Sequence, residues 1–177
     1  MPFKVQFNIW SQGKQAPDLT TLDRTLARIE YNERIRIMGR GHAAPHLQQV
    51  VTPVEPLTKS EEYLYLVYTV RHLQRQYFSH GRSQEIFKQA IAQEKRLDDW
   101  NTRNRFHLQG HPKFTPDDPK AFAFFQIVEQ WRIKWKAYFA YKKQRDADPA
   151  VVKERSKECR AYEKQIDAYI RENIGLV

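Results

Sequence analysis

The chain has 177 residues, of which 41% are hydrophobic and 29% charged, and it carries a formal net charge of +9. This composition excludes an intrinsically disordered chain, and no run approaches the ~18 consecutive apolar residues that a transmembrane helix needs. The single cysteine, Cys159, excludes an intramolecular disulfide and favours a reducing compartment.

The first ten residues, MPFKVQFNIW, have no basic leader followed by a long apolar core. We therefore expect no secretion signal. The expected location is the cytoplasm, without attachment to a membrane.

The N-terminal third of the chain carries two strand patterns and one helix pattern. Residues 3–10, FKVQFNIW, alternate between apolar and polar side chains, which predicts a β-strand. Residues 19–38 place leucine and isoleucine at helical spacing after Asp18, which predicts a helix with that aspartate as N-cap. Residues 46–54 are rich in β-branched side chains and predict a second strand, which Pro53 confines to an edge.

Two short strands around one helix are marginal on their own in water. We therefore expect residues 1–57 to form a strand-helix-strand segment that packs on the rest of the chain or on a partner. The first strand is the candidate for pairing with an edge of another chain. Its apolar face carries Phe3, Val5, Phe7 and Ile9.

From residue 58 onward the apolar spacing is helical. Thr58 and Glu61 form a capping box, which predicts the start of the first helix of this part. Two Asp-Pro pairs predict the starts of the last two helices: Asp118 with Pro119, and Asp148 with Pro149. The fold class that we predict is mainly α, with two antiparallel helical hairpins (58–101 and 116–174) in a four-helix bundle-like body that spans residues 58–177.

Short matches relate the two predicted hairpins to each other. QYF at 76–78 corresponds to AYF at 137–139, and EKRLDDW at 94–100 corresponds to EKQIDAY at 163–169. A duplicated hairpin explains these matches, and so does the similar composition of heptad-like helices. Both explanations stay open.

The pattern YLVYTVRHLQRQYF followed by FKQAIAQEKRLDDW resembles short helical-hairpin proteins of bacterial phages and mobile elements. The resemblance implies a phage or mobile-element origin. It carries no functional residues across to this chain.

Residues 125–145, FQIVEQWRIKWKAYFAYKKQR, combine aromatic and basic side chains, which is typical of a single-stranded nucleic-acid platform as well as of an amphipathic helix. On a helical wheel Trp131 and Trp135 fall within one apolar arc, which favours a buried core face. Three cations form a stripe on the flank of that arc: Arg132, Lys136 and Lys143.

A second group of cations lies near the end of the predicted N-terminal helix, around two glycines whose amides could approach an anion. It consists of Arg34, Arg36 and Arg40. Together the two groups are the candidate contacts for phosphate or for an acidic partner. The alternative for the second group is an ordinary helix C-terminus, where basic residues and glycine are common.

Two HxxxH pairs, His42 with His46 and His107 with His111, could supply four imidazole ligands to zinc. Both pairs fall in loops with glycine or proline, where spacing alone does not fix the rings on one face, so solvated histidines are the favoured interpretation. We expect no metal site and no catalytic residue. The chain also has no P-loop, dinucleotide fingerprint or GxSxG motif, and we expect no cofactor.

These features favour a non-catalytic structural or interaction protein, of the assembly or adaptor kind. Its expected partners are other protein chains, in a homo- or hetero-oligomer. The alternative is a nucleic-acid-binding protein that uses the basic helix flank. A metal-dependent enzyme is a distant third.

Overall fold

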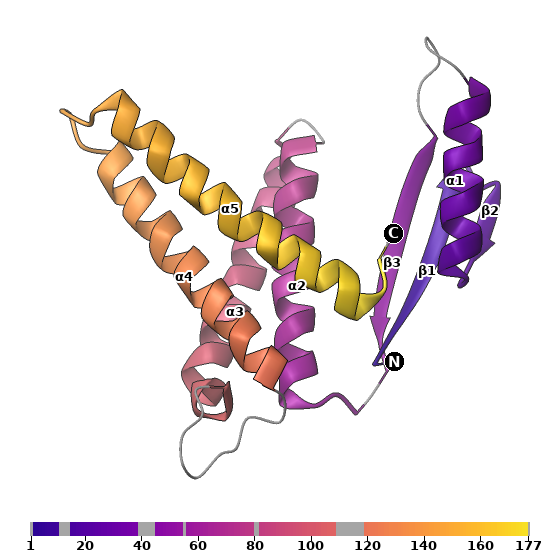
Figure 1. The fold of residues 1–177 in the computed structure, drawn as a ribbon, viewed down its shortest axis with the longest axis horizontal. Coiled ribbons are helices and arrows are strands. Elements are labelled where there is room, and N and C mark those ends of the chain that lie inside the picture. The colour runs from indigo at the N-terminus through magenta and orange to yellow at the C-terminus, as the bar shows by residue number, and fades with distance from the viewer. Residues whose placement is uncertain are drawn as a thin grey trace. The chain divides into compact units, whose positions relative to one another are not determined.

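The computed structural model describes residues 2–10, 15–38, 45–54, 56–79, 82–108 and 119–176. Within these ranges the chain forms five helices and one three-stranded antiparallel sheet (Figure 1). The prediction of a mainly α fold with a small β part is confirmed. The chain divides into two compact units: the first combines residues 1–57 with 170–177, and the second comprises residues 58–169.

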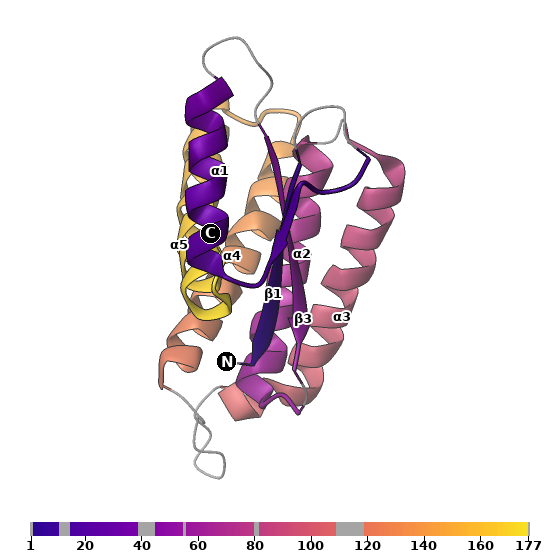
Figure 2. The same cartoon turned by 90° about the vertical axis from the view of Figure 1, so that its right-hand side faces the viewer.

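The sheet of the first unit has the strand order β2-β1-β3. β1 (Phe3–Trp10) pairs along its whole length with β3 (His46–Pro53), and the two strands run side by side (Figure 2). On the other side, Phe7–Ile9 of β1 pairs with the short β2 (Leu19–Thr21). The two predicted strands, β1 and β3, are confirmed. The sequence pattern did not predict β2, which adds a third strand to the sheet.

α1 (Arg24–Met38) begins five residues later than its apolar spacing predicts. The N-cap is Asp23, whose Oδ1 accepts hydrogen bonds from the backbone amides of Thr25 and Leu26 at 2.8 and 3.0 Å. The predicted cap, Asp18, instead donates its backbone amide to the Ile9 carbonyl at 2.8 Å. The prediction was wrong at this point because pairing with β1 satisfies the backbone of residues 19–21 before a helix can start.

The two faces of the sheet differ in polarity. Alternation along β1 buries one set of side chains: Phe3, Val5, Phe7 and Ile9. On the opposite face the Asn8 side chain accepts hydrogen bonds from Gln6 and Thr20 and donates one to Gln48. α1 contacts β1 and β2, and its Ala27 is completely buried. The C-terminal part of this unit has three buried side chains: Ile170, Ile174 and Leu176. The apolar face of β1 is thus part of the core.

The second unit contains two antiparallel hairpins: α2 (Lys59–Ser79) with α3 (Gln84–Leu108), and α4 (Pro119–Lys142) with α5 (Pro149–Ile174), whose residues from 170 onward belong to the first unit (Figure 1). The predicted capping box is confirmed, since the Thr58 amide donates to the Glu61 carboxylate at 2.7 Å and the Glu61 amide donates to Thr58 Oγ1 at 3.3 Å. Asp148 caps α5 as predicted, because its Oδ1 accepts the Ala150 amide at 2.8 Å.

The core of the second unit is rich in aromatic rings. The Tyr63 ring of α2 lies 5.1 Å from the ring of Trp100 in α3 and 5.4 Å from the ring of Phe125 in α4. Phe124 of α4 stacks on Tyr169 of α5 at 4.2 Å. All four helices therefore contribute rings or aliphatic side chains to a single interior, which also contains Val67, Val70, Leu97, Val128, Cys159 and Ile166.

Candidate interaction surfaces

The aromatic ridge of α4 is part of the core rather than an open platform. Trp131 is only 5% exposed, and the Arg71 guanidinium lies 5.6 Å from its ring centroid. Trp135 is half-buried, stacks on Phe139 at 5.1 Å, and donates its indole N–H to Glu163 Oε1 at 3.1 Å. The predicted core position is confirmed for Trp131, and Trp135 lies at the edge of that core.

A buried charge cluster joins α2 to α5 beside this ridge. The Arg71 side chain is 6% exposed and forms ion pairs of 3.0 Å with both Glu163 and Asp167. Trp135 and Glu163 extend the cluster to α4. The ion pairs and hydrogen bonds of the cluster join α2, α4 and α5, so the arrangement positions these helices.

The candidate phosphate contacts at the end of α1 are ion-paired within the first unit. Arg34 forms ion pairs with Asp18 at 2.9 Å and with Glu30 at 2.8 Å. The hydrogen bond to Glu30 raises the pKa of Arg34, and burial lowers it by a smaller amount. Arg36 contacts Glu33 at 2.6 Å. Arg40 lies outside the described residues. Arg34 and Arg36 thus already have carboxylate partners.

The three candidate contacts on the flank of α4 differ from one another. Arg132 forms ion pairs with Asp98 and Glu129, and burial holds its pKa below the ordinary value. Lys136 is exposed on the same helix flank, and Lys143 is exposed in the turn that follows the end of the helix at Lys142. The flank and this turn therefore offer two exposed lysines and one arginine that is engaged with its own chain.

The candidate partner-pairing strand has another role. β1 carries Phe3, Val5, Phe7 and Ile9, and it is the central strand of its sheet, bonded to β3 along its length and to β2 over residues 7–9. The four side chains are buried. Pairing within the chain therefore occupies one edge of β1 along its length and the other edge over residues 7–9, and pairing with another chain through this strand stays a prediction.

Of the four candidate zinc-binding histidines, only His46 has a described side chain. It is exposed at the end of β3, with its ring 5.5 Å from that of Trp10. His42, His111 and the side chain of His107 lie outside the described parts. Among the side chains that the structure describes, no group of three or more His, Cys, Asp or Glu residues is placed to hold a metal ion.

An exposed apolar stripe on α1 is a surface that the sequence pattern did not reveal. On the helix it consists of Leu26, Ile29 and Ile37, of which Ile29 is 58% and Ile37 72% exposed, and the exposed Leu22 lies just before the helix starts. In the sequence pattern, Leu26 and Ile29 are only part of the helical spacing that predicts a helix over residues 19–38. The buried face of α1 is centred on Ala27, about 100° around the helix from Leu26.

The comparisons with known proteins supply no relative from which a role can be transferred. No protein-family model, curated protein or solved structure matches the chain. In the described ranges, no helix combines the length and the apolar character that crossing a bilayer requires.

Proposed function

We propose that the protein is a non-catalytic assembly protein that associates with a second copy of itself through the exposed stripe of α1. The observation that carries this proposal is the stripe itself, a row of large aliphatic side chains on the outside of a small unit. Contiguous exposed apolar surface of this kind is characteristic of protein–protein interfaces.

The spacing of the stripe suits another helix. Leu26 and Ile29 lie three residues apart on α1, which is a spacing that helices use along a packing seam, and the exposed Leu22 lies just before the helix. Glu33 continues the row at the next interval of four, so the seam is apolar at its start and polar after one turn. Ile37 returns to the same face 11 residues after Leu26.

A second copy supplies the matching helix directly. In a two-fold symmetric dimer the same patch of both chains meets, which needs only one self-complementary surface per chain. The charges near the stripe do not oppose such a contact, because Arg34 is neutralised by Glu30 and Asp18, and Arg36 by Glu33. A copy therefore approaches a surface with little net charge.

The proposal includes a location in the cytoplasm or within a phage particle, and an origin in a phage or mobile element. Cys159 is a free thiol buried in the second unit, which suits a reducing compartment. The resemblance of the first hairpin to phage and mobile-element proteins supports the same setting.

Size-exclusion chromatography with light scattering tests the proposal on the full chain. We expect a mass of twice 21.2 kDa for the wild type. The double substitution Leu26→Lys/Ile29→Lys should return the monomer mass with an unchanged far-UV circular dichroism spectrum, because both positions are exposed. Ile133→Lys, at an exposed apolar position on α4, is the matched control and should leave the dimer mass unchanged.

Two outcomes would overturn self-association through α1. One is a wild-type chain that stays monomeric at every concentration, including a monomer that is purified with a different protein bound. The other is a double variant that is folded and keeps the dimer mass.

A further inference from the structure

The fold pairs several carboxylates of α5 with cations of other helices. Three acidic side chains point toward neighbouring helices, where Glu158 pairs with Lys134 at 3.0 Å and Glu163 and Asp167 pair with Arg71 at 3.0 Å. These contacts neutralise carboxylates that, in the sequence, alternate with basic residues. Several exposed basic residues of α5 take no part in these contacts.

Four cations follow one another along the outer face of α5: Lys153, Lys157, Arg160 and Lys164. All four are exposed, and no hydrogen bond, ion pair or ring contact engages them within the described part of the chain. Intervals of four, three and four residues keep them within an arc of about 60° and along about 16 Å of helix axis. We call this row the α5 cationic stripe.

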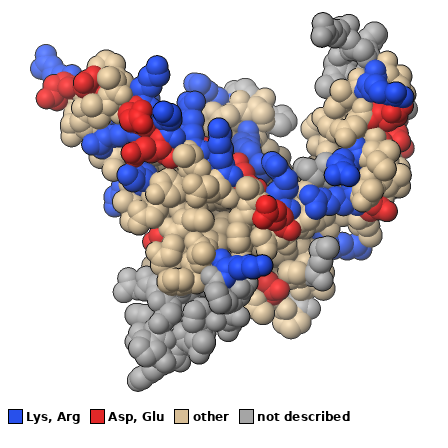
Figure 3. All heavy atoms as spheres, viewed as in Figure 1, with Lys and Arg blue, Asp and Glu red and all other residues tan. Residues whose placement is uncertain are grey.

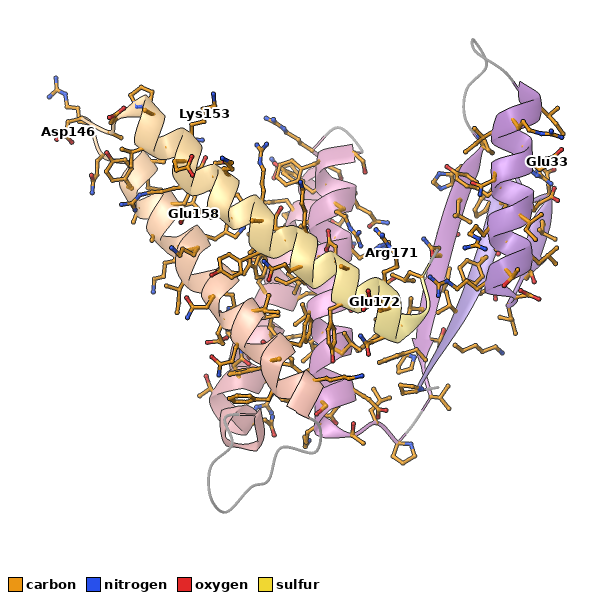
Figure 4. All side chains as sticks on the ribbon, viewed as in Figure 1. Glu33, Asp146, Lys153, Glu158, Arg171 and Glu172 are labelled. Carbon is orange, nitrogen blue, oxygen red and sulfur yellow. The ribbon has the colours of Figure 1, made fainter. Side chains whose placement is uncertain are left out.

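The pictures show where these side chains lie. Lys and Arg side chains gather along the outer edge of α5 (Figure 3). Lys153 points away from α4, whereas Glu158 lies on the side of α5 that pairs with Lys134 of α4 (Figure 4). Arg155 is the inward exception, because its guanidinium donates to the Ala137 carbonyl at 3.4 Å and lies 4.4 Å from the Tyr141 ring centroid.

We infer that the α5 cationic stripe binds the phosphate backbone of a nucleic acid. A straight row of cations at regular intervals matches a polymer with a repeating negative charge better than it matches a single acidic group. Ala161 and Ala168 are exposed beside the row, so no bulky side chain keeps a polymer backbone away. The row lies on a different helix face and a different unit from the stripe of α1.

Two other anionic partners fit the stripe less well. A helix that binds a membrane surface inserts large apolar side chains next to its cations, and the exposed neighbours of this row are alanine, glutamine and glutamate. An interface with an acidic protein needs a dry apolar centre, which the same neighbours do not supply. A nucleic-acid backbone needs only charge and access.

Binding through this row should not depend on base sequence. Lysine contributes a point charge rather than the fixed fork that reads base edges, and three of the four residues are lysine. If all four contact phosphates of a duplex, log Kobs should fall with log salt concentration with a slope of about −3.6.

Fluorescence anisotropy with a labelled short DNA duplex tests the inference on the full chain. We expect saturable binding with the salt slope given above. The variant Lys157→Gln/Arg160→Gln/Lys164→Gln should bind about tenfold more weakly or worse, and its slope should be smaller by about three, since each lost phosphate contact removes about one. Exposed positions on one helix face allow these changes without loss of the fold.

The matched control removes the same net charge from α4 and the loop after it. Lys136→Gln/Lys143→Gln/Arg145→Gln also replaces exposed cations, and it should retain both the affinity and the salt slope. Equal losses in the two triple variants would overturn the inference, because binding would then follow net charge alone. A loss in the control variant only, or binding to phosphatidylserine vesicles but not to the duplex, would also overturn it, as would no binding at all.

The outcome of the DNA-binding experiment does not depend on whether the protein forms a dimer through α1. The Leu26→Lys/Ile29→Lys variant leaves the α5 cationic stripe intact, so it should still bind the duplex with a similar salt slope. A monomeric wild type with a steep salt slope would therefore refute self-association and support the inference about α5.

Discussion

Arg71 of α2 and Asp167 of α5 meet through two parallel hydrogen bonds, from Nε to Oδ1 and from Nη2 to Oδ2, both 3.0 Å long. The planar guanidinium matches the carboxylate in this geometry, and the pair is shielded by its position between helices. Glu163 adds a second carboxylate at 3.0 Å from Arg71. This contact fixes the position of α5 against α2 of the first hairpin.

Arg71→Ala should therefore be strongly destabilising. Removing Arg71 leaves two partly buried carboxylates, 23% and 19% exposed, without their main partner, and the loss for a fully buried pair, about 3–5 kcal/mol of unfolding free energy, is the upper value. Urea denaturation followed by circular dichroism measures the change. Arg75→Ala is the control, because Arg75 is 46% exposed and lies 3.8 Å from Asp167, so we expect a cost of about 0–1 kcal/mol. Similar losses in the two variants would show that the buried geometry is not the cause.

Asp148→Ala should lower the unfolding free energy by about 1 kcal/mol, because the Ala150 amide loses the carboxylate that caps α5. The neighbouring Asp146 is exposed in the same turn and accepts none of the described helix amides (Figure 4). Asp146→Ala is therefore the matched control, with an expected change close to zero. An equal effect of the two substitutions in thermal denaturation would contradict the role of Asp148 as a cap.

Stability should fall when the pH is lowered through 6.5, the ordinary pKa of histidine. His72 stacks on Tyr68 at 5.6 Å in α2, and burial, with a smaller effect of Arg75, lowers its pKa in the folded chain. Below pH 6.5 the unfolded chain binds a proton that the folded chain does not yet accept, so the unfolding free energy decreases until the folded pKa is passed.

His72→Gln should remove this part of the pH dependence, which urea denaturation on either side of pH 6.5 measures. Glu129 contributes with the opposite sign, because burial raises its pKa and its protonated form is favoured in the folded chain. Glu129 is present in both chains, so its contribution cancels when the unfolding free energies of wild type and variant are subtracted at each pH. The same pH dependence in both chains would rule out His72 as its source.

Cys159 should react slowly with a thiol reagent in the native chain. The side chain is fully buried, and burial, followed by the nearby Glu163 and Glu158 carboxylates, raises the pKa of its thiol. Colorimetric titration with a disulfide reagent should show fast reaction only in denaturant. Equal rates with and without denaturant would mean that the last helix is open at this position.

Most of the helices and strands could be predicted because local signals agree with the final fold. The capping box of Thr58 and Glu61 and the cap at Asp148 are local, and both start helices where predicted. The start of α1 could not be predicted in this way. Residues 19–21 have a helical pattern, yet they pair with residues 7–9, and only the long-range contact decides between the two.

The surfaces were harder to predict than the elements. Leu26 and Ile29 have the spacing of a core face, and nothing local indicates that Ala27 marks the buried side of α1 instead. In the sequence of α5, Glu163 and Asp167 stand next to cations whose charge they would balance. Their partner, Arg71, lies 96 residues from Asp167, so this pairing becomes visible only in the folded chain.

The most direct test of self-association measures whether α1 is covered at high protein concentration. In the variant Ile29→Cys the new thiol should react with a maleimide more slowly as the protein concentration rises, because the second copy covers it. Ile133→Cys should react at a constant rate, and wild type with its buried Cys159 gives the background rate. A rate at position 29 that is fast and independent of concentration, up to the highest concentration reached, would contradict the proposed role of α1.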